Sequence, residues 1–73
     1  MSKTVFNYIF LKDKIAKKYG SQSNFAKAMN ISYQEMSNKI NNKTSFSQDQ
    51  IFTAVKLLNL TEAEVVSCFF NTL

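Results

Sequence analysis

Uncharged polar side chains between residues 33 and 38 offer the clearest recognition chemistry in this chain. Residues three and four apart are neighbours on a helix, so a helix over 33–41 would gather four of them on one exposed face: Tyr33, Gln34, Ser37 and Asn38. Gln and Asn amides pair bidentately with adenine, and a Ser hydroxyl donates to or accepts from several bases. The face is therefore suited to reading base edges in duplex DNA. The alternative is a polar surface that only faces solvent.

The chain has few side chains of the types that serve in catalysis or metal binding. The chain contains no His and one cysteine, Cys68, and its five acidic residues are not clustered. Acid–base and nucleophilic catalysis need such groups within mutual reach, and zinc sites need several His or Cys ligands. We therefore expect no enzyme activity, no cofactor and no metal. A single cysteine also excludes an internal disulfide and fits a reducing cytosol.

Positive charge is concentrated in the first part of the chain. The net charge is +4, but residues 1–43 carry eight of the nine lysines against two acidic residues, whereas residues 44–73 carry one lysine against three. A basic surface attracts polyanions such as DNA, and lysines give sequence-independent affinity through phosphate contacts. Lys39 and Lys43, beside the polar face, are the expected phosphate contacts. Lysines that merely solvate a small protein are the alternative.

Two short helices joined by a tight turn must position this face. Apolar residues at helical spacing predict helices over about 22–29 and 33–41. Asn30 falls at the reversal between them, where Asn accepts a left-handed conformation more readily than other residues except Gly. Ser32 then caps the second of these helices, and Glu35 stands three residues later to complete a capping box. This part of the chain therefore predicts helix, turn, helix.

An earlier helix should precede this pair. An apolar side chain recurs every three or four residues over about 7–19, with lysines between, and Gly20 ends the pattern. Phe6 and Phe10 lie off that stripe. We expect them to pack beneath the C-terminal segment, because aromatic residues at helical spacing usually belong to a core. A second contact surface is the alternative.

Two more helices should follow, each with a capping box at its start: Ser47 with Gln50, and Thr61 with Glu64. The absence of Pro and the single Gly favour a wholly helical chain. A core built from 73 residues is too small to divide. We therefore expect one all-α domain of five helices over residues 1–73.

The C-terminal segment holds more apolar side chains than the last helix of a small monomer can bury. They fall on more than one side of that helix, so part of it should meet a partner chain, identical or not. The residues expected at this partner interface are Val66, Phe69, Phe70 and Leu73. No stretch is long enough to span a membrane, and residues 5–11 are too short and too interrupted for a signal peptide. A membrane is therefore not an expected partner.

Two stretches carry a resemblance to a known family: YGSQSNFAKAMNIS, residues 19–32, and FSQDQI, residues 46–51. With their flanking helices, from about Tyr8 to Phe70, they resemble the phage repressor and Cro-type helix-turn-helix family, including small Cro-like and modulator-of-repression proteins of temperate phages. The resemblance implies a five-helix lambda-repressor-like DNA-binding domain, whose second and third helices form the helix-turn-helix. It also implies a protein of the host bacterial cytoplasm.

Roles for individual residues also follow from the resemblance. Gln22 matches a position that clamps a phosphate, and Ala26 matches a small residue needed where two helices approach closely. The start of the third helix enters the major groove in this family, and Asn41 and Lys43 match a turn that contacts the backbone. The complete set of expected DNA contacts is Gln22, Ser32, Tyr33, Gln34, Ser37, Asn38, Lys39, Asn41 and Lys43.

Two functions fit these residues. The first is a phage-type transcriptional regulator that binds operator DNA as a homodimer and controls a switch between lysis and lysogeny. The second is an antirepressor or co-repressor that acts mainly by binding a partner repressor protein. Three departures from the family pattern motivate the second: no Arg is present, Lys39 stands where an aliphatic residue is usual, and Glu35 lies near the reading face. The missing Arg removes the commonest guanine-reading side chain, Lys39 would leave the third helix less firmly seated, and Glu35 would repel phosphate.

Overall fold

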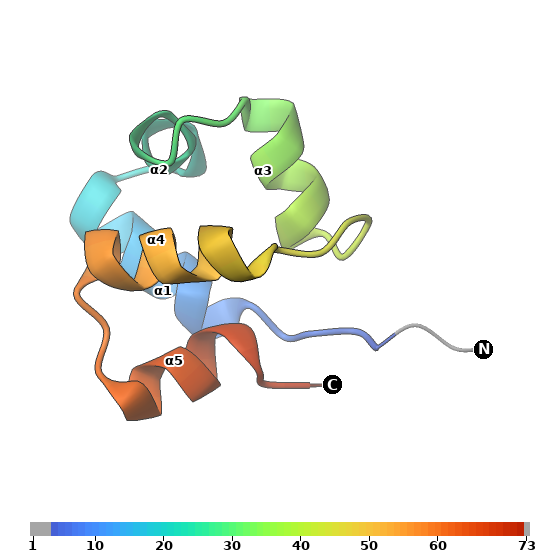
Figure 1. The fold of residues 1–73 in the computed structure, drawn as a ribbon. Helices are drawn as coiled ribbons and strands as arrows, with labels where there is room; N and C mark the ends of the chain where they lie inside the picture. The colour runs from blue at the N-terminus through green and yellow to red at the C-terminus, as the bar shows by residue number, and fades with distance from the viewer. Residues whose placement is uncertain (1–3, 73) are drawn as a thin grey trace.

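Five helices account for the secondary structure of residues 4–72, the part of the chain that this computed structural model describes. They are α1 (Ile9–Tyr19), α2 (Gln22–Ala28), α3 (Tyr33–Ile40), α4 (Gln48–Leu58) and α5 (Glu62–Phe69), shown in Figure 1. Within the described residues no strand forms, although an antiparallel bridge joins Phe6 to Thr72. The predicted all-helical fold of five helices is therefore confirmed. None of these helices is long and apolar enough to cross a membrane.

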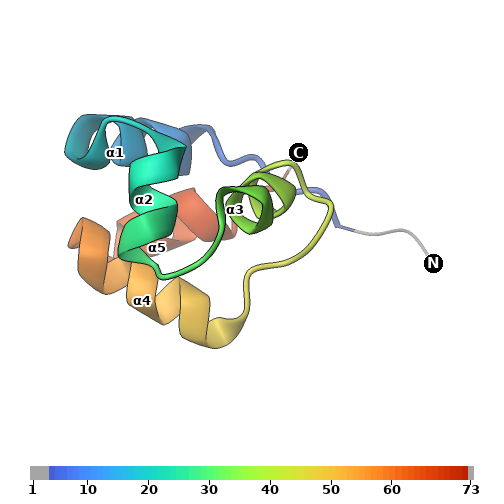
Figure 2. The same cartoon turned by 90° about the horizontal axis from the view of Figure 1, so that it is seen from above.

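The first helix holds most of the others together. α1 packs against α2, α4 and α5, whereas α3 packs mainly against α2. Figure 2, seen from above, shows α2 between α1 and α3, with the connection from α3 to α4 looping past the end of α3. Because α3 packs mainly against one helix, its orientation depends on further contacts at its ends.

Four of the five helices start with a hydroxyl side chain that accepts a hydrogen bond from the backbone N–H three residues later: Ser21, Ser32, Ser47 and Thr61. Such a cap satisfies one of the donors that a helix start leaves without a partner. At Ser47 and Thr61 the side chains of Gln50 and Glu64 also accept a hydrogen bond from the cap residue's own N–H, both at 2.9 Å. The two capping boxes predicted there are confirmed.

Only one of the two hydrogen bonds of the capping box predicted at Ser32 is present. Ser32 Oγ accepts a hydrogen bond from the Glu35 N–H at 3.0 Å, but the Glu35 carboxylate accepts from Gln50 Nε2 on α4, at 3.2 Å, instead of from the Ser32 N–H. The prediction of a full box at Ser32 was wrong because a donor from another helix competes for the carboxylate. Spacing along the sequence cannot reveal such a competitor.

Helix boundaries differ from the expected ones by one or two residues. α1 begins at Ile9 rather than Asn7, because Asn7 pairs with the C-terminal segment. Its N–H donates to the Asn71 carbonyl at 2.7 Å, while its side chain accepts from the Ile9 N–H at 3.1 Å. α2 and α3 each end one residue earlier than expected, at Ala28 and Ile40. The order and type of every helix are unaffected.

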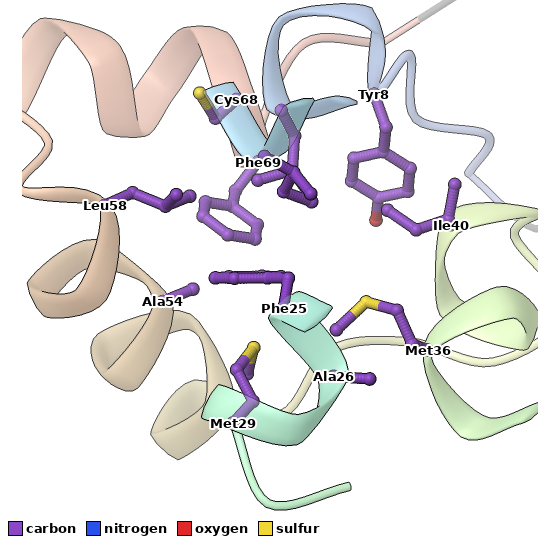
Figure 3. Packing of buried hydrophobic residues seen from close by; sticks show 12 residues of the cluster. Tyr8, Phe25, Ala26, Met29, Met36, Ile40, Ala54, Leu58, Cys68 and Phe69 are labelled. Atoms are coloured by element: carbon purple, nitrogen blue, oxygen red, sulfur yellow. The ribbon is translucent and has the colours of Figure 1, made fainter. Parts of the chain in front are cut away.

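Phe25 lies at the centre of the core. Its side chain is fully buried, and in Figure 3 its ring lies among Ala54 of α4, Met29 after α2 and Phe69 of α5. Burying an aromatic side chain of this size contributes about 1.5–3 kcal/mol of stability. The other large side chains that are fully buried are Leu11, Ile15, Met36 and Cys68. Phe25 therefore joins the second helix to both C-terminal helices.

A row of aromatic rings links the N-terminal segment to α5. The Phe6 ring stacks on Tyr8 with centroids 6.0 Å apart, and Tyr8 meets Phe46 edge-on at 5.6 Å. Phe46 meets Phe69 edge-on at 5.3 Å. Phe6 packs against the core, as expected, but Phe10 is 53% exposed. The prediction that Phe10 also packs was wrong, because it lies in the first turn of α1, off the buried stripe.

An ion pair ties α5 to α1. The Lys14 ammonium donates a hydrogen bond to the Glu64 carboxylate, and the two side chains are 39% and 34% exposed. The hydrogen bond from Lys14, together with that from the Thr61 backbone N–H, lowers the pKa of Glu64 to about 2. The hydrogen bond to Glu64 raises the pKa of Lys14 in turn. Glu64 therefore closes the cap of α5 and fastens that helix to α1 with the same carboxylate.

Replacing this carboxylate should change how stability depends on pH. Because the folded-state pKa of Glu64 lies below its ordinary value of 4.5, ionised Glu64 stabilises the fold above that pH, and this contribution is lost as the pH falls towards 2. Glu64→Gln keeps an acceptor for the cap but removes the charge. We expect its thermal midpoint to lie below that of the wild-type chain at pH 7 and to converge with it near pH 2.

Asp13→Asn provides the control, because the Asp13–Lys17 pair is an exposed pair within one helix turn. Exposed pairs of this kind contribute only about 0.3–0.5 kcal/mol, so this variant should follow the wild-type midpoint at every pH. A difference between Glu64→Gln and the wild-type chain that stays constant from pH 7 to pH 2 would contradict the role assigned to Glu64.

Candidate interaction site on α2 and α3

The turn between α2 and α3 closes α2 with a left-handed residue. Asn30 has φ 61°, its N–H donates to the Lys27 carbonyl at 3.0 Å, and the Ile31 N–H reaches back to the Ala26 carbonyl at 3.0 Å. This pair of hydrogen bonds is the Schellman arrangement that ends many helices. Ala26 is buried, with 1% of its surface exposed. The reversal predicted at Asn30 is confirmed.

Five polar residues that we expected to act in recognition lie along α3 and its end: Tyr33, Gln34, Ser37, Asn38 and Asn41. We call this set the α3 face. Tyr33 is 57% exposed, and Gln34 and Asn41 are also exposed, while Ser37 and Asn38 are half-buried. Gln34 Nε2 donates to Asn38 Oδ1 at 3.0 Å, and Asn41 Nδ2 donates to Ser37 Oγ at 3.2 Å. These two pairs hold four of the side chains in set directions.

The other expected contacts are distributed around this face. Gln22, the first residue of α2, is half-buried, and Lys43, after α3, is exposed. Ser32 is exposed, but its Oγ already accepts the hydrogen bond that caps α3. The structure therefore brings Lys43 and Ser32 to the two ends of α3, while Gln22 lies on the preceding helix.

Lys39 departs from its expected role. Only 7% of the residue is exposed, and its ammonium donates to the Ser45 carbonyl at 2.9 Å, with Glu35 Oε2 at 3.9 Å and the Phe46 ring centroid at 5.9 Å. In this conformation the ammonium cannot reach a phosphate. The expectation that Lys39 contacts DNA phosphate was wrong for this structure, because a carbonyl and a carboxylate inside the fold bind its charge.

The α3 face carries little net charge as a result. Glu35, expected to repel phosphate near this face, is half-buried and turned towards Gln50 and Lys39. Lys43 remains as an exposed cation at the end of α3. Recognition by this surface would therefore rest on hydrogen bonds and on the Tyr33 ring more than on positive charge.

The partner interface expected at the C-terminus is present only in part. Val66 and Phe70 are 59% and 53% exposed and lie four residues apart, hence on the same side of α5. Phe69 is 3% exposed, so the expectation that it meets a partner was wrong: its ring packs on Phe46 inside the core. Leu73 lies outside the described residues.

Three further exposed apolar side chains were not anticipated: Ile9 and Phe52, each 60% exposed, and Val5, 45% exposed. Phe52 lies off the buried stripe of α4, and Lys56 Nζ stands 4.5 Å from its ring centroid. The signal was available, because Phe52 falls between Ile51 and Ala54 but not on their side of the helix. Among the residues described, no group of His, Cys, Asp or Glu could hold a metal ion, and no pocket opens.

Residues 4–72 match the model of a family described as a protein of unknown function, DUF739. The chain belongs to the DUF739 family. This DUF739 protein is also similar to the solution structure of the modulator of repression (MOR) of the temperate bacteriophage TP901-1 from Lactococcus lactis, with a TM-score of 0.79 and 39% sequence identity. That match covers 90% of this chain and 89% of the other. Comparison with curated proteins finds no match.

The expected likeness to modulator-of-repression proteins of temperate phages is thus supported. Membership of the wider phage repressor and Cro-type family, with its helix-turn-helix, stays a prediction. The similarity to a phage modulator of repression suggests a regulatory role in a phage for this chain.

The left-handed residue at the start of this site gives a direct stability test. Asn30→Gly should keep the free energy of unfolding or raise it, because Gly adopts φ 61° without a steric penalty. Asn30→Ala should lose about 1–2 kcal/mol, since a Cβ in the left-handed region meets the following carbonyl. Denaturant unfolding measures both values, and Ser23→Ala, on the exposed side of α2, is the control. Equal stabilities of the Gly and Ala variants would contradict the assigned turn.

Proposed function

We propose that this DUF739 protein regulates repression in a temperate phage by binding a phage repressor protein through the α3 face and Lys43. The observation that carries the proposal is the similarity to a phage modulator of repression, at 39% identity over 90% of this chain. A likeness at that level over nearly the whole chain supports a related role. Because that protein modulates repression, a repressor is the natural target of its kind.

The chemistry of the α3 face favours a protein partner over nucleic acid. DNA-binding surfaces are strongly positive, and phosphate contacts supply most of their affinity. Here the Lys39 ammonium is turned inward, the chain has no Arg, and Lys43 is the cation at the end of α3. A nearly neutral face of amides, hydroxyls and one aromatic ring suits a protein surface better.

The α3 face also has the make-up of a small protein interface. Tyr33 is an exposed aromatic side chain at the start of α3, and Tyr is enriched among the residues that dominate interface energies. Around it, the Gln34–Asn38 and Ser37–Asn41 pairs are already formed. Side chains held in place before binding lose less conformational entropy when a partner arrives. The face therefore combines preorganised polar pairs with one aromatic side chain at its start.

Replacing Tyr33 tests the proposal directly. Tyr33→Ala should weaken binding to the repressor encoded in the same phage genome by about tenfold or more, because truncating an aromatic anchor typically costs about 2 kcal/mol or more. Phe52→Ala is the matched control, since Phe52 is an aromatic residue of similar exposure on α4. Titration calorimetry gives the affinities, and the mass of the mixture in solution gives the stoichiometry. Unchanged binding by Tyr33→Ala, or equal losses in both variants, would contradict the assigned surface.

Operator DNA is the second candidate partner. One observation favours it: Gln34 and Asn38, two side chains suited to adenine, lie together on the helix that follows a tight turn. Lys27 in α2 and Lys43 beyond α3 are both exposed and could contact phosphates on either side. In this case the protein would act as a transcriptional regulator, as a dimer on paired half-sites.

Salt dependence separates the two candidates. If DNA is the target, binding to the phage regulatory region should weaken with salt. Lys43→Ala should then reduce the log–log slope by about 0.9, because the variant neutralises one phosphate fewer. Lys18→Ala, on α1, should leave the slope unchanged. Binding that does not distinguish the regulatory region from random DNA in a gel-shift series would argue against this second candidate.

A further inference from the structure

Lys39, itself buried, is the centre of a polar connection between α3 and the segment that leads to α4. Its ammonium donates to the Ser45 carbonyl at 2.9 Å and stands 3.9 Å from Glu35 Oε2. The ring of Phe46, which packs into the aromatic row of the core, lies 5.9 Å from the same nitrogen. One ammonium thus contacts Glu35 on its own helix, α3, and the connection that follows α3.

Gln50 extends this connection to α4. Its Nε2 donates to Glu35 Oε2 at 3.2 Å, and its Oε1 accepts from the Ser47 N–H at 2.9 Å. The path from Ser45 through Lys39, Glu35 and Gln50 to Ser47 therefore links the end of α3 to the start of α4. Because α3 packs mainly on α2, this path gives α3 a second fixed point.

The connection between α3 and α4 contains an exposed turn, Asn42 to Ser45, which we call the 42–45 turn. Asn42 holds its first end: its side chain accepts from the Phe6 N–H at 2.9 Å and donates to the Phe6 carbonyl at 3.0 Å. Lys39 holds its last end through the Ser45 carbonyl. Lys43 and Thr44 are exposed between the two, and their N–H groups donate to the Asn38 carbonyl at 2.8 and 3.3 Å. The turn therefore lies directly beside the α3 face.

Stability alone does not account for an ammonium at this position. Removing the Lys39 ammonium from water is costly. Its carboxylate neighbour, Glu35, has a side chain that is 44% exposed and keeps its hydrogen bond from Gln50, so an apolar side chain at position 39 leaves no buried charge without a partner. Met has nearly the same length as Lys, is unbranched and packs well against an aromatic ring such as that of Phe46. The hydrogen bond from Lys39 to the Ser45 carbonyl is what Met cannot supply. Ser45 is exposed, so without this bond its carbonyl can turn to water.

We infer that Lys39 is a positioning residue, which holds the 42–45 turn and the α3 face in one orientation for a partner without touching that partner itself. The inference rests on the proposed function for its effect on binding. Its structural part, the fixing of the 42–45 turn, is independent of the partner's identity. Lys39 thus contributes to recognition through the geometry of Lys43 and Thr44.

Lys39→Met is the decisive variant, with Lys56→Met as its matched control. Both remove one lysine ammonium near a phenylalanine ring, but Lys56 is exposed on α4 and far from this turn in the sequence. For Lys39→Met we expect a thermal midpoint equal to or above the wild-type value. We also expect amide hydrogen exchange at Lys43 and Thr44 to be faster by about tenfold, because that segment opens locally. Lys56→Met should change neither property.

Binding supplies the second readout. Lys39→Met should bind the phage repressor more weakly by about fivefold to tenfold, since a loosened surface must be ordered on association. Wild-type exchange at Lys43 and Thr44, or a lowered midpoint with faster exchange throughout all helices, would overturn the inference. If the wild-type chain does not bind the repressor at all, the proposed function fails, while the exchange measurement still tests the positioning role.

Asn42→Gly tests the other anchor of the same turn. Glycine keeps the left-handed backbone at φ 63° but removes both hydrogen bonds to Phe6. We expect faster exchange at Lys43 in this variant, with α3 still closed by its backbone hydrogen bonds. Unchanged exchange at Lys43 in both variants would show that the turn is fixed by other contacts and would overturn the inference.

Discussion

The shortness of the helices is the constraint on which the structure depends. They are 7 to 11 residues long, and isolated helices shorter than about 12–15 residues are marginal in water. Each must therefore be closed at its ends and packed along one side. Left-handed residues close the first four: Gly20, Asn30, Asn42 and Asn59. Three of these are Asn in a chain with one Gly, because Asn is the other residue that tolerates this conformation. Phe25 then gives the closed helices a common core.

Features that act within a few residues of the chain could be predicted, and those that depend on distant residues could not. The capping box at Ser47 and the reversal at Asn30 are local, so spacing in the sequence was enough. The direction of the Glu35 carboxylate depends on Gln50, fifteen residues away. Phe69 packs in the core on the ring of Phe46, which in turn meets Tyr8, and only the folded chain brings these three rings together.

The candidate site shows the same division. The pattern of polar residues placed Gln34 and Asn38 on one face of α3, and the helix brings them into contact. Counting lysines, by contrast, overstated the positive charge available to a partner. Lys14 and Lys17 are paired with carboxylates, and Lys39 is turned into the fold. A charge count along a sequence cannot distinguish a lysine that binds inside the protein from one that faces a partner.

Several side chains that close a helix end also bind a residue far away in the chain. Gln50 caps α4 and donates to Glu35 of α3, and Glu64 caps α5 and pairs with Lys14 of α1. Asn42 differs in that it closes α3 with its left-handed backbone, while its side chain holds both polar groups of the Phe6 backbone. A domain of this size buries only about 60% of its unfolded surface, so its core alone gives modest stability. When one side chain serves both a helix end and a distant contact, losing it weakens both. The helix starts, the termini and the orientation of the α3 face are therefore parts of one cooperative unit.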